Sequence, residues 1–90
     1  MSDTQTMKQW TIEAEIMPKA GVNDPQGEAV HSGLQALGFG VADRVRVGKR
    51  IEVRVQAASH EEAVAYGTEM CDKLLANPVI ESFTISAREG

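Results

Sequence analysis

Residues 10–16 read Trp-Thr-Ile-Glu-Ala-Glu-Ile, and this stretch decides the fold. Every second position is apolar, and each position between is polar. A period of two is typical of a strand with one buried face and one face in water. The stretch therefore predicts a strand that follows a polar N-terminal tail, ends before Pro18 and rests on a single apolar layer.

The chain after this strand predicts a helix that begins at Asp24. Pro18 and Gly21 interrupt the alternation, the Asp24 side chain suits an N-cap, and Pro25 fits the first helical position, where no N–H donor is missed. Apolar residues then recur at helical spacing, at Val30, Leu34 and Leu37. Gly38 supplies the left-handed residue that commonly ends a helix.

Two further alternating stretches predict a hairpin. One runs from about Val41 to Val47, the other from Ile51 to Gln56, and the tripeptide Gly48-Lys49-Arg50 joins them. Both apolar faces reach the same core only if the loop has an odd number of residues, because successive side chains alternate between faces. That register places Arg46 opposite Glu52.

The last third of the chain predicts a second helix and a final strand. Ser59 and Glu62 form a capping box at the helix start, and Asn77 and Pro78 end it. The expected buried stripe consists of Ala63, Tyr66, Gly67, Met70 and Leu74, with Cys71 at its margin. The final strand is expected from about Val79 to Ala87.

The element order β-α-β-β-α-β predicts an α+β fold of the ferredoxin-like kind. We expect a four-stranded antiparallel sheet of order 4-1-3-2, with both helices on one face because the crossovers are right-handed. Residues 1–7 are expected to form a flexible tail, and residues 8–90 a single domain. The opposite sheet face is polar, and there Arg54 is expected to reach Glu13 or Glu15.

The composition excludes several classes of function. Ninety residues give one small core and little room for a ligand cleft, so we expect a chain that is not an enzyme on its own. A net charge of −4 lacks the basic footprint of a nucleic-acid binder. No apolar run is long enough to span a bilayer, and the first residues lack the apolar core of a signal peptide. The single cysteine, Cys71, suits a reducing cytoplasm.

No motif predicts a catalytic, cofactor or metal site. The Gly38-Phe39-Gly40 segment follows a helix instead of preceding one, so it does not match a dinucleotide fingerprint. Gly48-Lys49 lacks the Ser or Thr and the helix of a phosphate-binding loop. His31, His60 and Cys71 have no partners at metal-ligand spacing. A set of nucleophile, base and orienting group cannot be assembled from these residues.

Three segments resemble the PurS family, the small subunits of bacterial and archaeal phosphoribosylformylglycinamidine (FGAM) synthase. They are residues 18–27 (PKAGVNDPQG), residues 36–39 with 45–49 (ALGF and VRVGK), and residues 70–81 (MCDKLLANPVIE). The likeness covers roughly residues 8–87, in the right order. The matched residues that make caps, stops and turns are Gly21, Asp24, Pro25, Gly27, Gly48, Asn77 and Pro78. Arg46 and Lys49 also match, and their charges lack a complete structural explanation.

The resemblance implies a non-catalytic subunit in purine biosynthesis. The FGAM synthase complex uses glutamine and ATP with Mg²⁺; a PurQ-type glutaminase releases ammonia, and a PurL-type synthetase performs the amidation. The PurS-type subunit bridges these two and assists ammonia transfer, binds no cofactor of its own and self-associates as a dimer or tetramer. The resemblance carries over no catalytic residues.

Two questions stay open at this point. Self-association through an edge strand and through the charged sheet face both fit the pattern. A regulatory domain of the ACT type, which binds a small molecule, is the alternative function, because it shares the expected strand order. The candidate partner interface is a basic strip around the predicted hairpin, formed by Arg44, Arg46, Lys49, Arg50 and Arg54.

Overall fold

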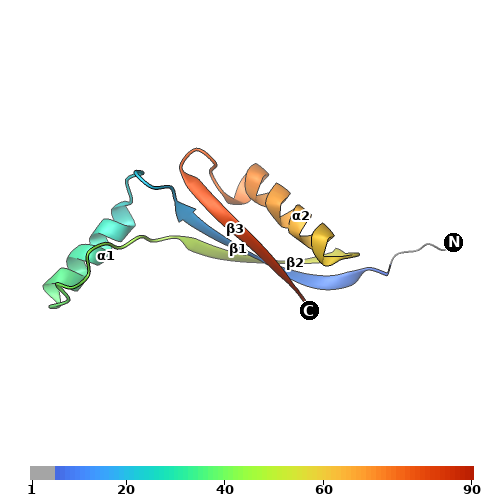
Figure 1. Cartoon of the computed structure of the whole chain (residues 1–90), viewed down its shortest axis with the longest axis horizontal. Coiled ribbons are helices and arrows are strands. Elements are labelled where there is room, and N and C mark those ends of the chain that lie inside the picture. Colours follow the sequence, from blue (N-terminus) through green and yellow to red (C-terminus); the bar gives the residue numbers. More distant parts are fainter. Residues whose placement is uncertain (1–5) are drawn as a thin grey trace.

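The computed structural model describes residues 6–90, so the outer part of the expected tail, residues 1–5, lies outside the described residues. The elements are β1 (Lys8–Pro18), α1 (Pro25–Ala36), β2 (Lys49–Ala57), α2 (His60–Met70), a π-helical turn η1 (Cys71–Leu75) and β3 (Glu81–Glu89). The three strands form one antiparallel sheet of order β2-β1-β3. Helix α2 lies across one face of this sheet, whereas α1 lies beyond its end (Figure 1).

The core lies between α2 and β1, the central strand. Ile12 and Ile16 of β1 are completely or almost completely buried. On the same face, Ile12 is paired with Val53 of β2 and Ala87 of β3, so one apolar layer crosses all three strands. The alternation of residues 10–16 therefore predicts both the central strand and its buried face correctly.

A glycine allows α2 to approach the sheet closely. A Cβ atom at Gly67 would lie 2.8 Å from Ile12 Cγ2 and 3.0 Å from Ile85 Cγ2, so this position has no room for a side chain. The predicted capping box holds the start of α2: Ser59 Oγ accepts from the Glu62 N–H at 3.1 Å, and the Glu62 carboxylate accepts from the Ala58 N–H at 2.8 Å.

The prediction of a four-stranded sheet of order 4-1-3-2 is wrong. Residues 41–47 form no strand and pair with nothing in the described sheet, so the hairpin and the pairing of Arg46 with Glu52 are also absent. The Val47 N–H, which a ladder would use, instead donates to the carboxylate of Asp24 at 2.9 Å. Only the relative order of the other three strands is as expected. The ACT-type alternative loses its basis, because it depended on the four-stranded order.

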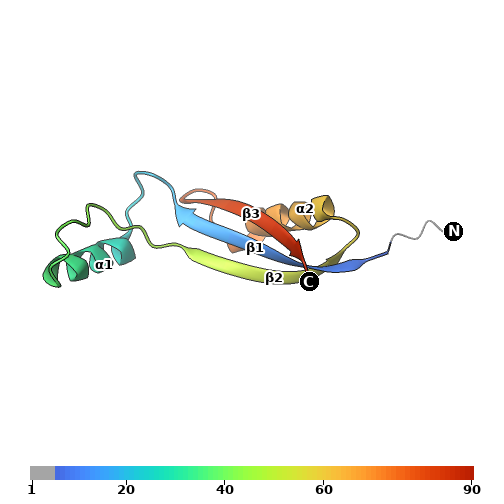
Figure 2. The ribbon, with the colours of Figure 1, turned by 60° about the horizontal axis from the view of Figure 1, so that its bottom comes forward.

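The placement of both helices on the sheet is also wrong. Helix α1 and the chain on either side of it project from the end of the sheet as an arm, defined here as residues 19–48 (Figure 2). The molecule measures 65 × 26 × 14 Å and has a radius of gyration of 17.9 Å. A compact chain of this length has a radius of about 12 Å. The arm therefore makes this fold extended.

The polar sheet face carries an ion-pair network centred on Glu13. Its carboxylate accepts from Arg88 and lies 2.5 Å from Arg50, which also contacts Glu52 at 3.0 Å. Arg54 does not reach Glu13 or Glu15 as expected, and donates instead to Gln9 Oε1 at 2.7 Å. Because these groups satisfy one another, the face is close to electrically balanced.

Candidate functional site

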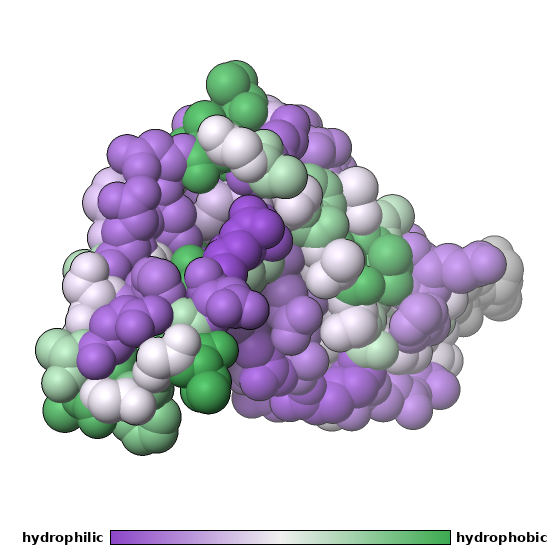
Figure 3. Space-filling view, turned by 60° about the vertical axis from the view of Figure 1, so that its left-hand side comes forward, coloured by the Kyte–Doolittle hydropathy of each residue, from purple (hydrophilic) through white to green (hydrophobic). Residues whose placement is uncertain are grey.

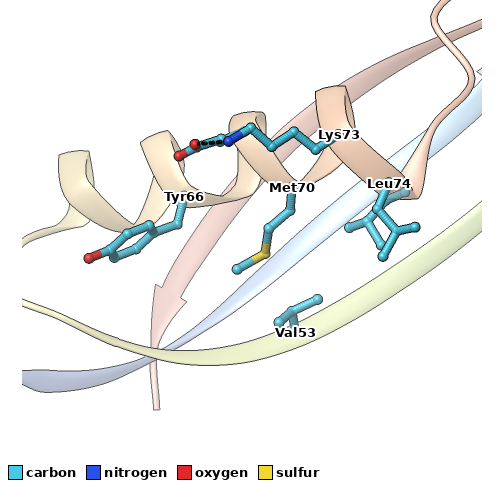
Figure 4. Close-up of a pocket in the computed structure, with 7 residues that line it drawn as sticks. Val53, Tyr66, Met70, Lys73 and Leu74 are labelled. Carbon is cyan, nitrogen blue, oxygen red and sulfur yellow. Dashed lines mark hydrogen bonds and ion pairs between the residues drawn. The ribbon is translucent and has the colours of Figure 1, made fainter.

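An uncovered apolar groove runs between α2 and β2. Its cavity volume is about 440 Å³. Tyr66, Met70 and Leu74 project from the helix toward Val53 on the strand (Figure 4). The full lining is Val53, Tyr66, Glu69, Met70, Lys73, Leu74 and Leu75. In most two-layer folds a second helix fills such a position. Here the face of the sheet beside α2 is left open.

The π-helical turn exposes a leucine in this groove. The Ala76 N–H donates to the Cys71 carbonyl at 3.1 Å, the five-residue spacing of a π-turn. This wider turn rotates the following side chains relative to an α-helix. Leu74 is 82% exposed, whereas Cys71, the first residue of the turn, is fully buried, although the predicted stripe had Leu74 in the core and Cys71 at its margin. Tyr66 of the predicted stripe is also exposed, at 39%. Burial raises the pKa of the Cys71 thiol, so it packs in the core as a neutral group.

A charged rim borders the groove on its outer side. Lys73 Nζ lies 2.7 Å from Glu69 Oε2, one helical turn away (Figure 4). The hydrogen bond from Lys73 lowers the pKa of the Glu69 carboxyl, and the same bond raises the pKa of Lys73. Both groups are exposed, so this pair contributes little to stability. Its effect is to place fixed charges at the edge of an otherwise apolar surface.

The arm carries a second apolar surface that nothing covers. Only Gly27 is buried in α1. Val30 is 45% exposed, and the residues after the helix are more open, with Leu37 at 75% and Val41 at 88%. Figure 3 views this end of the molecule and shows hydrophobic side chains gathered at its tip. Within residues 6–90, α1 has no strand or helix packed along its apolar side.

The arm has two legs: residues 19–36, which end with α1, and the returning leg, residues 37–48. Asp24 joins these legs at the base of the arm. The carboxylate accepts from the Gly27 N–H at 3.0 Å and from the Val47 N–H at 2.9 Å. These two bonds, first that from Val47 and then that from Gly27, lower the pKa of the Asp24 carboxyl. The predicted cap and the proline at the first helical position are both confirmed. The second bond was not predicted, because it joins residues 23 positions apart.

Two of the family-like segments meet at one end of the sheet. The Lys19 N–H donates to the Ile80 carbonyl at 2.8 Å, and Lys19 Nζ donates to the Pro78 carbonyl at 2.5 Å. Asn77 Oδ1 accepts from the Val79 N–H at 3.1 Å, which shapes the same turn. Lys19 did not emerge as a site residue from the sequence, because its partners lie 59 or more residues away.

Glycines at the base of the arm permit close approach of the backbone. Gly21 has a φ of +83°, a conformation that favours glycine. A side chain at Gly48 would collide with the Ile16 carbonyl and with Met17. These matched positions therefore make the turn and the crossing through which the chain leaves β1 and returns to β2.

The structure divides the predicted basic strip into two groups. Arg50 and Arg54 lie on the polar sheet face, where they are bound to Glu13, Glu52 and Gln9. The other three cations lie on the exposed returning leg of the arm and at the start of β2. These are Arg44, Arg46 and Lys49, and among residues 6–90 none of them makes an ion pair.

The described part of the chain offers neither a metal site nor a membrane-spanning helix. No group of three or more His, Cys, Asp or Glu side chains is placed to hold a metal ion among residues 6–90. No helix there has the length and apolar character needed to cross a membrane.

Comparison with known proteins agrees with the sequence resemblance. Residues 11–89 match the family described as PurS, phosphoribosylformylglycinamidine (FGAM) synthase. The chain is 46% identical over 71 residues to the FGAM synthase subunit PurS of Archaeoglobus fulgidus, covering 79% of this chain and 89% of that protein. It is 47% identical over 74 residues to the PurS subunit of Synechocystis, covering 80% and 74%.

A solved structure shares the extended architecture. The chain matches a chain in the structure of PurLQS from Thermotoga maritima with a TM-score of 0.80 and 28% identity, covering 93% of this chain and 100% of that one. The arm is therefore part of the shared fold, since so complete an overlap includes residues 19–48.

Proposed function

This chain belongs to the PurS family of FGAM synthase subunits, and on that basis we propose that it bridges the other subunits of the enzyme and assists ammonia transfer between them. FGAM synthase acts in purine biosynthesis. The observation that supports a bridging role is the arm, because it presents exposed apolar side chains of α1 and of the residues after it away from the chain's own core. Such a surface favours contact with another protein.

The partners in this proposal are a PurL-type synthetase and a PurQ-type glutaminase. The Thermotoga maritima structure is named for a PurLQS assembly, and this chain matches the full length of one of its chains. We assign ATP, Mg²⁺ and glutamine to the other subunits, so this chain binds none of them. We place the assembly in the cytoplasm, which agrees with a lone, buried Cys71.

Leaving this chain out of the assembly tests the bridging role. With purified synthetase and glutaminase, we expect glutamine-dependent FGAM formation to fall by on the order of tenfold or more when the chain is omitted. Ammonia-dependent formation, which needs no transfer between subunits, should change little. An unchanged glutamine-dependent rate without the chain would refute the proposal.

Self-association is the second part of the proposed function. Isolated helices of about 12 residues are only marginally stable in water, so α1 needs a surface to pack on. Its own groove is out of reach, because Lys19 is fastened to Ile80 at one side of the arm base and Asp24 to Val47 at the other. We therefore assign the groove of a second copy as the surface that α1 covers.

Charge and symmetry both favour a second copy as the occupant. Helix α2 and η1 carry four acidic residues against one lysine: Glu61, Glu62, Glu69 and Asp72 against Lys73. The returning leg of the arm carries Arg44 and Arg46 against one acid, Asp43, and neither arginine makes an ion pair within residues 6–90. Each copy would give one arm and receive one, which closes a twofold dimer and leaves no unfilled groove. This route differs from both routes that the sequence left open.

The two arginines of the returning leg give a test of the charged contact. We expect the double replacement of Arg44 and Arg46 by Ala to weaken subunit association by about tenfold at low salt and by much less at high salt, because exposed charges are screened. Replacing Arg54, which is bound to Gln9, is the matched control and should have little effect. Sedimentation at two salt concentrations measures this. Equal losses at both salt concentrations would show that charge is not the cause.

A further inference from the structure

We infer that Asp24 is the positioning residue that sets the direction of α1 relative to Val47, two residues before β2, and through Val47 relative to the sheet. Its carboxylate binds the first turn of α1 and the returning leg at the same time. The consequence for assembly rests on the proposed dimer. The role of Asp24 within a single chain does not, and the two can be measured separately.

The two legs are in contact at the base because Gly27 has no side chain. A Cβ atom there would lie 2.6 Å from the Val45 carbonyl oxygen and would also collide with the Asp24 carboxylate. Gly27 is accordingly the one buried residue of α1. The hydrogen bond from the Val47 N–H to the Asp24 carboxylate lies beside this contact and is called the clamp below. Gly27 and the clamp together hold the two legs at the base.

The legs are also joined near the tip. His31 Nε2 lies 2.7 Å from the Ala42 carbonyl oxygen, and Gln35 Nε2 donates to the same oxygen at 3.1 Å. The two legs are thus joined both at the base and near the tip. A rotation of about 20° at the base would displace the far end of a helix about 18 Å long by about 6 Å. A clamp at the base therefore controls where the apolar tip arrives.

Serine at position 24 separates the clamp from the helix cap. A serine hydroxyl is as good an N-cap as a carboxylate, but it has one oxygen in place of two, so the Val47 N–H loses its own acceptor, Oδ2 of Asp24. We expect Asp24→Ser to speed hydrogen exchange of the Val47 amide by about tenfold or more, and to raise the dissociation constant of self-association by about tenfold. Asp24→Ala, which loses both bonds, should show at least the same changes.

Glu28→Gln is the matched control. Glu28 lies in the same first turn of α1 and carries the same charge, but it is exposed and its side chain joins no other leg. The exchange rate of the Val47 amide and the dissociation constant of self-association should both stay within about twofold of the unmodified chain. Protection of the Ile12 amide, in the centre of the sheet, shows whether each variant retains its core.

Two results would overturn parts of this picture. If Asp24→Ser keeps the exchange rate of Val47 and the dissociation constant of the unmodified chain, Asp24 is a helix cap alone and the inference is wrong. If the unmodified chain sediments as a monomer at every concentration, the proposed dimer is wrong. In that case faster exchange of the Val47 amide in Asp24→Ser still supports the clamp, and an unchanged rate contradicts it.

Discussion

Replacing Met70 by glutamate is expected to convert the chain from a dimer to a monomer. Met70 projects into the groove opposite Val53, and the proposed contact would seal it beneath α1 of a second copy (Figure 4). A carboxylate enclosed there without a partner costs about 3 kcal/mol or more. Since each 1.4 kcal/mol is a tenfold change, the dissociation constant should rise by more than about 100-fold. Sedimentation velocity over a concentration series measures it.

Thr68→Glu is the matched control for this substitution. Thr68 is an exposed residue of α2 that does not line the groove. The substitution therefore adds the same charge to the same helix but outside the groove. Its effect on self-association should stay below about tenfold. If Met70→Glu sediments as the unmodified chain does, the groove is not the contact surface and another surface must cover α1.

Replacing Ile12 by alanine is expected to give the largest loss of stability for a single truncation. Ile12 has no exposed surface, and it lies where β1, α2 and both neighbouring strands meet. Truncating a buried Ile to Ala costs about 2–5 kcal/mol through lost burial and a residual cavity. Small domains are stable by only roughly 5–15 kcal/mol, so the variant should be near its limit. Urea unfolding at fixed protein concentration, followed by Trp10 fluorescence, measures the free energy of unfolding.

Ile80→Ala is the control, since it removes the same atoms from a residue that is 41% exposed. Its loss should be about 1 kcal/mol or less. The difference between the two variants isolates burial, because residue type and change are identical. Equal losses at both positions would mean that the core is not centred on β1.

Local patterns predicted the elements well where one segment decides its own structure. The alternation of residues 10–16 depends only on which side chains avoid water, so it predicted β1 and its face. Asp24, Ser59 and Glu62 accept from backbone N–H groups within four residues, and Pro25 occupies the first helical position, so these caps were predicted and are found. The resemblance predicted the family for a similar reason, since its segments are local strings.

Predictions failed where a local pattern was read as evidence for a distant contact. Residues 41–47 alternate as a strand does, but alternation cannot supply a neighbouring strand. The predicted stripe of α2 failed at Tyr66, which is 39% exposed, and at its end, where a π-turn leaves Leu74 exposed and Cys71 is buried. The neighbouring leucines 74 and 75 were the available signal, since successive helical residues do not face the same core.

The sequence by itself determined three strands, two capped helices, one apolar sheet face and membership of a family of enzyme subunits. Only the tertiary structure decided that α1 lies outside the core and that a groove stays open beside α2. It also decided that Arg50 and Arg54 are bound to Glu13, Glu52 and Gln9 on the sheet face. The physical reason is the range of the interactions. Caps and alternation act within a few residues, whereas Asp24 with Val47 and Lys19 with Pro78 join residues 23 and 59 positions apart.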